Sequence, residues 1–204
     1  MNKDANSPPI AAQARIGHVH LKVADLERAL GFYRDVLGFE LTQRYGRQAA
    51  FLSAGGYHHH IGLNTWESAG GSPPAGGTTG LYHLAILYPT RADLADAFRR
   101  LQQAGIPLEG ASDHGVSEAL YLRDPDGNGV ELYWDRPQNQ WPRNRQGEIE
   151  MFTRPLDLKD LLIEVFGLLK PARLMVLQGQ GQHFRDGAHG ASPSGRLAWY
   201  DSTN

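Results

Sequence analysis

The sequence predicts an α+β fold in which paired βαβββ modules form a curved mixed sheet, or half-barrel, around a metal cavity. A strand with period-two alternation, an amphipathic helix and three short strands occur in this order twice. A histidine stands near the start of each copy, His18 in the first and His83 in the second, 65 residues apart. A carboxylate, Glu131, interrupts the apolar last strand of the second copy. We expect a C-terminal helical extension to follow the modules.

Composition excludes several classes of protein. The 204 residues carry 20 Lys and Arg against 22 Asp and Glu, so a strongly basic nucleic-acid binder is excluded. No apolar run reaches the roughly 18 residues of a membrane span, and no secretory signal is visible, so we expect a cytoplasmic protein with no membrane partner. Cysteine is absent and histidine occurs nine times. Any metal must therefore be held by imidazole and carboxylate groups.

The first module is expected over residues 15–66, after an N-terminal arm over 1–14. Asp25 is placed to cap its helix, and Gly38 to end it with a left-handed residue. The elements expected in this module are a strand over 16–23, a helix over 26–37 and strands over 40–45, 49–53 and 58–64.

The second module is expected over residues 81–135, after a linker rich in Gly, Pro, Ser and Thr. Thr90 and Asp93 form a capping-box pattern at the start of its helix. The sequence DPDGNG over 124–129 predicts a tight hairpin turn. The elements expected here are a strand over 82–88, a helix over 91–104 and strands over 107–111, 118–123 and 130–134.

Residues 136–204 are expected to form a separate extension. An amphipathic helix is predicted over 155–169, and a Gly-rich segment over 178–195 is predicted to be flexible. The polar face of the helix is acidic, which favours packing, a lid or a dimer contact over membrane binding.

The alternation of the strands predicts that His18, His83 and Glu131 point into one cavity, away from the helices. A carboxylate among apolar residues needs a partner, because burial of a lone charge is costly. Two imidazoles and one carboxylate are the facial set associated with non-haem Fe(II). The alternative is that both histidines are core residues bonded to the backbone and that Glu131 is a structural ion-pair partner.

Three consecutive histidines, His58, His59 and His60, lie in the predicted last strand of the first module. Neighbouring strand residues face opposite sides of a sheet, so either His59 faces the cavity or the other two do. A solvated run at the edge of the sheet is the alternative.

Segments 16–41, 81–108 and 121–134 resemble the vicinal oxygen chelate superfamily, which includes extradiol dioxygenases, glyoxalase I, fosfomycin-resistance transferases and bleomycin-binding proteins. Within it, extradiol enzymes of the catechol 2,3-dioxygenase type are the most similar. A glyoxalase I site would need a second glutamate at the end of the first module. Glu67 instead lies in the linker.

This resemblance implies an iron site made of His18, His83 and Glu131. It also implies that His59 is the general acid and base, that Tyr121 bonds a substrate oxygen, and that His114 assists. The expected activity is Fe(II)-dependent ring cleavage of a catechol-like diol with O2 by a homodimer; Mn, Zn or Ni are other metals to consider. The alternatives are an isomerase, epimerase or thiol transferase of the same superfamily, and a metal-free protein that binds an antibiotic.

Overall fold

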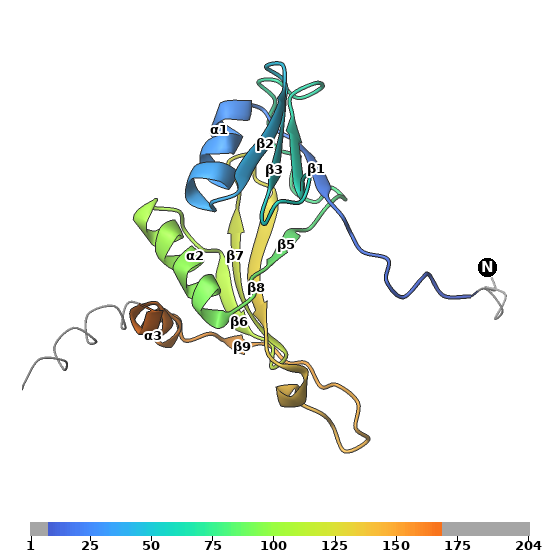
Figure 1. Ribbon diagram of the computed structural model, residues 1–204, viewed down its shortest axis with the longest axis vertical. Coiled ribbons are helices and arrows are strands. Elements are labelled where there is room, and N and C mark those ends of the chain that lie inside the picture. The colour runs from blue at the N-terminus through green and yellow to red at the C-terminus, as the bar shows by residue number, and fades with distance from the viewer. Residues whose placement is uncertain (1–7, 169–204) are drawn as a thin grey trace, which may run out of the picture. The chain divides into compact units, whose positions relative to one another are not determined.

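The structure is a computed structural model that describes residues 8–168. It contains two mixed sheets with helices against them, which confirms the predicted α+β class (Figure 1). The segment 178–195, which was expected to be flexible, lies outside the described residues.

The first sheet has four strands in the order β1-β4-β3-β2, and its outer pair β1–β4 is parallel. Asp25 caps the helix as predicted, since its carboxylate accepts a hydrogen bond of 3.0 Å from the Arg28 amide. Gly38 ends the helical segment with φ of +87°. The elements are β1 (Val19–Lys22), α1 (Leu26–Leu30), a π-helical continuation η1 (Gly31–Val36), β2 (Glu40–Tyr45), β3 (Ala49–Ser53) and β4 (Ile61–Asn64).

The second sheet has five strands in the order β5-β8-β7-β6-β9, and β5–β8 is again parallel. Thr90 caps this helix as predicted, because the Asp93 amide donates to the Thr90 hydroxyl at 3.1 Å. The Asp93 carboxylate accepts from that hydroxyl at 2.6 Å, which differs from the reciprocal bond to the Thr90 amide in a full capping box. In the predicted turn, Asp124 accepts hydrogen bonds from the backbone of Asp126 and Asn128. The elements are β5 (Leu84–Leu87), α2 (Arg91–Gln103), β6 (Gly110–Asp113), β7 (Ser117–Arg123) and β8 (Gly129–Asp135).

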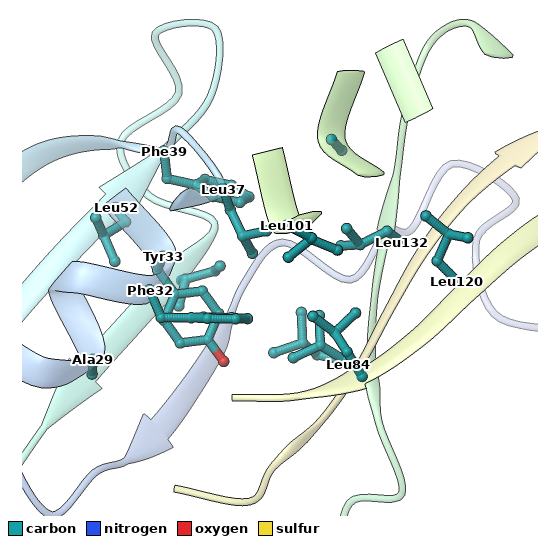
Figure 2. Packing of buried hydrophobic residues seen from close by; sticks show 14 of the residues in the cluster. Ala29, Phe32, Tyr33, Leu37, Phe39, Leu52, Leu84, Leu101, Leu120 and Leu132 are labelled. Carbon is teal, nitrogen blue, oxygen red and sulfur yellow. The ribbon is translucent and has the colours of Figure 1, made fainter. Parts of the chain in front are cut away.

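One hydrophobic core joins the two modules. The helical segment of the first module and α2 lie on the same side of the two sheets (Figure 1). Phe32, Tyr33 and Leu37 from the first module belong to the same buried cluster as Leu101 and Leu132 from the second (Figure 2). Burial of apolar surface stabilises a fold by about 25 cal/mol per Å², so this shared core is the main force that holds the modules together.

Several predicted strands begin later than the sequence pattern suggests. The strand expected over 58–64 begins only at Ile61, after a turn in which Gly55 and Gly56 adopt positive φ. The strand expected over 107–111 lies instead at Gly110–Asp113. Pro107 has no amide hydrogen to donate to a sheet, which disfavours an early start.

The first strand of each module is also shorter than expected. As a result, His18 lies one residue before β1 and His83 one residue before β5. The two histidines therefore keep equivalent positions, but each lies at the entrance to its strand.

The extension returns to the second sheet before its helix begins. A short strand, β9 (Arg154–Pro155), pairs with β6, after a 3-10 turn η2 (Gln138–Gln140). The helix α3 (Leu158–Leu168) packs against α2 and buries Leu161 and Val165. It starts three residues later than predicted because residues 154–155 are engaged in the sheet. None of the helices over residues 8–168 has the length and apolar character needed to cross a membrane.

Candidate metal and catalytic site

Glu131 is the centre of a polar cluster on the second sheet. Its Oε2 lies 2.9 Å from His83 Nε2, and its side chain is 14% exposed. Its Oε1 lies 3.1 Å from the Tyr121 hydroxyl oxygen and can accept the phenol hydrogen. The β7–β8 pairing sets Tyr121 directly opposite Glu131. Tyr121 stands ten residues before Glu131 in the sequence because the two form a cross-strand pair.

His114 extends this cluster. It lies in the turn between β6 and β7, and its Nε2 is 2.8 Å from the Tyr121 hydroxyl oxygen. A continuous series of contacts therefore runs from His114 through Tyr121 and Glu131 to His83. Four of the residues singled out in the sequence lie together.

The environment keeps the Tyr121 phenol protonated. Burial and then the neighbouring Glu131 carboxylate raise the pKa of Tyr121 to about 12. At neutral pH the phenol is therefore a hydrogen-bond donor.

His18 is separate from this cluster. Its ring packs on that of His59, with 4.5 Å between the ring centroids. Over residues 8–168, no three His, Asp or Glu side chains are arranged as a metal-binding group. The structure thus brings together His83 and Glu131 of the expected ligand set and leaves His18 outside the pair.

Two cavities meet at His83. One, of about 500 Å³, is lined by Tyr121, His114 and Thr153 as well as His83. The other, of about 730 Å³, is lined by His18 and His60 as well as His83. His18 therefore faces a cavity that also reaches the cluster.

The first module has no counterpart of Glu131. The β1–β4 and β5–β8 ladders have the same register, which makes Gly62 the residue equivalent to Glu131. A Cβ at Gly62 would lie 2.9 Å from the ring of His20, so the imidazole occupies the space of the missing side chain. The carboxylate cluster is a feature of the second sheet.

The histidine run lies in a bend before β4, so strict strand alternation does not govern it. His60 lines the larger cavity, and its Nδ1 is 3.2 Å from the Ser53 hydroxyl. His59 lies against His18, and its Nδ1 is 2.7 Å from that of His58. Burial, followed by the charges of His18 and His58, lowers the pKa of His59 below its usual value.

The sequence reasoning missed two residues that contact His114. The Phe152 carbonyl oxygen and the Thr153 hydroxyl lie 3.1 Å and 3.2 Å from His114 Nδ1. Both belong to the extension, 38 and 39 residues further along the chain. No local pattern or repeat position could indicate this contact.

The residues present suit part of a divalent metal site. An imidazole and a carboxylate are appropriate donors for Fe(II) or Mn(II). His83 lines an open cavity, and Glu131 lies 2.9 Å behind it. His83 Nδ1 is buried without a hydrogen-bond partner, so no second hydrogen bond orients its imidazole.

Two mixed sheets, each with a parallel strand pair joined through a helix, define a class of small-molecule enzymes and binding proteins. Residues 15–132 match the model of the Glyoxalase/Bleomycin resistance protein/Dioxygenase superfamily, and the chain belongs to this family.

Two relatives are similar to the chain in sequence. Catechol-2,3-dioxygenase of Bacillus subtilis (strain 168) is 45% identical over 155 residues, which cover 76% of this chain and 53% of that protein. Biphenyl-2,3-diol 1,2-dioxygenase 3 of Rhodococcus globerulus is 37% identical over 129 residues, 59% of this chain and 63% of that protein. The chain thus spans less than two thirds of the length of either relative.

The solved structure supports the fold alone. A crystal structure of a glyoxalase/dioxygenase from Nostoc punctiforme has a TM-score of 0.53 and 19% sequence identity. The similarity covers 67% of this chain and 99% of that one.

Proposed function

We propose that this protein is an extradiol dioxygenase that opens the ring of a catechol-like diol with O2. The observation that carries the proposal is a cluster in which His83, Tyr121 and His114 line one cavity and Glu131 contacts two of them. The similarity to proteins named as diol dioxygenases supports it.

In this proposal His83 and Glu131 hold a divalent metal, and His18 is the third ligand. Fe(II) is the preferred metal and Mn(II) the next, with Zn and Ni less suited to a reaction that uses O2. When bound, the metal supplies Lewis acidity and a common point of attachment for the diol and O2.

The other residues bind the substrate and move protons. Tyr121 is protonated at neutral pH. In the substrate complex its one hydrogen turns from the protein acceptor that holds it in the free chain to a substrate oxygen. His59 has a lowered pKa and is neutral at pH 7, so it can accept a phenolic proton from the substrate. His114 bonds to the Tyr121 hydroxyl and sets its direction.

The test measures O2 consumption and the coloured ring-opened product over a panel of catechols, after loading with Fe(II) or Mn(II). We expect turnover with at least one catechol, and its loss in Glu131→Ala. Stoichiometric metal without O2 uptake on any catechol would contradict a dioxygenase and favour an isomerase, epimerase or thiol transferase. Absence of metal binding would favour a metal-free binding protein.

A further inference from the structure

The extension holds the His114 turn through its backbone. The Phe152 amide donates to the His114 carbonyl oxygen at 3.3 Å, while the Phe152 carbonyl oxygen lies 3.1 Å from His114 Nδ1. The Thr153 hydroxyl lies 3.2 Å from the same nitrogen. One nitrogen of the imidazole thus has two oxygen partners, both from the extension.

Packing fixes the same contact. Gly115, next to His114, has φ of +77°, and a Cβ there would lie 2.6 Å from the Phe152 ring. The guanidinium of Arg154 covers that ring, with its carbon 4.1 Å from the ring centroid. Arg154 in turn pairs with Asp113 in the β6–β9 ladder. Phe152 therefore packs against two of the three residues of the turn, and Arg154 ties the same segment to β6.

These contacts select one tautomer of His114. A carbonyl oxygen can only accept a hydrogen bond, so Nδ1 must carry the hydrogen that faces Phe152. In the neutral ring Nε2 is then an acceptor. It lies 2.8 Å from the Tyr121 hydroxyl, which is also 3.1 Å from Glu131 Oε1. The phenol has one hydrogen and two acceptors, and the ring of His114 is the nearer one.

We propose that the extension completes the catalytic site. Phe152 and Thr153 are positioning residues that hold His114 with its hydrogen on Nδ1 and its Nε2 directed at the Tyr121 hydroxyl. Thr153 also lines the cavity of about 500 Å³ with Tyr121 and His83. Its hydroxyl therefore holds the His114 ring at the wall of that cavity. The expected effect of these two residues on turnover rests on the proposed function, whereas their expected effect on the tautomer of His114 does not.

The first experiment observes the imidazole directly. The full chain, free of metal and substrate, is labelled with ¹⁵N-histidine, and the His114 ring signals are assigned by comparison with His114→Gln. We expect two-bond ¹⁵N–¹H couplings typical of the Nδ1–H tautomer at pH 8. An Nε2–H tautomer in the wild-type chain would overturn the proposal, whatever the activity.

The second experiment separates the hydroxyl from the shape of the side chain. Thr153→Val removes the hydroxyl and keeps the volume, whereas Thr153→Ser keeps the hydroxyl. A hydrogen bond contributes about 1 kcal/mol, so we expect kcat to fall about fivefold in Thr153→Val with KM within about twofold of wild type. We expect Thr153→Ser to recover most of the loss, and Thr78→Val, at an exposed linker threonine, to change nothing.

Equal kcat in Thr153→Val and wild type would overturn the role of the hydroxyl. A loss that Thr153→Ser does not recover would assign the effect to packing and would also overturn it. If no catechol is turned over by the wild-type chain, the proposed function fails and the tautomer measurement still decides the inference. Thr153→Val is then expected to shift the His114 ¹⁵N signals, while Thr78→Val leaves them in place.

Discussion

The phenol of Tyr33 in η1 donates a hydrogen bond of 2.9 Å to the Asp124 carboxylate in the turn between β7 and β8. Tyr33 is fully buried and Asp124 is 4% exposed. The next acidic residue of that turn, Asp126, accepts from the Ala24 amide and from Arg28. One turn of the second module thus binds both α1 and η1 of the first module.

Tyr33→Phe should weaken this junction. The change leaves a buried carboxylate with one donor fewer, which costs about 1–3 kcal/mol. Urea unfolding should show the loss, and Tyr45→Phe, at a residue 67% exposed, should show none. Equal stability of wild type and Tyr33→Phe would contradict a role for the bond in joining the modules.

The same residue predicts a pH dependence. Burial, followed by the charge of Asp124, raises the pKa of Tyr33 far above its ordinary value near 10. The neutral phenol is favoured in the folded state, so its contribution to stability is complete below pH 10 and is lost as the pH rises above that value. Unfolding measured between pH 8 and 11 should show a steeper decline for wild type than for Tyr33→Phe. Parallel curves would contradict this assignment.

Gly129 is predicted to be essential for the position of His83. A Cβ at Gly129 would overlap the Tyr82 carbonyl oxygen and lie 3.0 Å from the His83 Cα. These are backbone atoms that cannot move without shifting His83 away from Glu131. Gly129→Ala should lower the free energy of unfolding by about 2 kcal/mol or more and weaken Mn(II) binding measured by calorimetry.

Gly76→Ala is the matched control, because a Cβ there meets nothing within 4 Å. It should retain both stability and binding. Wild-type behaviour of Gly129→Ala would show that β5 can separate from β8 without cost.

Glu118 is predicted to anchor the extension. It is 4% exposed, and its two oxygens accept hydrogen bonds of 2.7 Å from Arg91 and Arg136. Arg91 also reaches Asp160 in α3 at 2.8 Å. Glu118→Ala leaves two half-buried guanidinium groups without their shared partner and should cost about 3 kcal/mol.

Glu109→Ala removes an exposed partner of Arg123, 3.0 Å away, and should cost less than about 1 kcal/mol. Chemical denaturation of both variants checks the difference. Similar losses in the two would contradict the importance of burial at Glu118.

Much of this architecture could be predicted from local patterns. The caps at Asp25 and Thr90 and the turn that begins at Asp124 depend on residues within four positions of one another. The proximity of Tyr121 and Glu131 follows from a hairpin with a short turn. The fold class and the Tyr121–Glu131 part of the site follow from such short-range rules.

The remaining features depend on contacts between distant segments. Strand alternation places His18 on a face of its own sheet, but it does not say how the two sheets are set against each other. The contact of Phe152 with His114 spans 38 residues and is made by a backbone carbonyl, which every residue type provides. Neither feature leaves a signal in the spacing of side chains.

The assignment of His18 can be tested against the pair that the structure brings together. If His18 is the third ligand, His18→Ala should weaken Mn(II) binding to the full chain by tenfold or more, as His83→Ala and Glu131→Ala should. His20→Ala, two residues further along the chain in β1, is the control and should bind as wild type. Calorimetry on metal-free protein gives the affinities. Binding by His18→Ala equal to that of His20→Ala would exclude His18 as a ligand and leave His83 and Glu131 as the protein's contribution to the site.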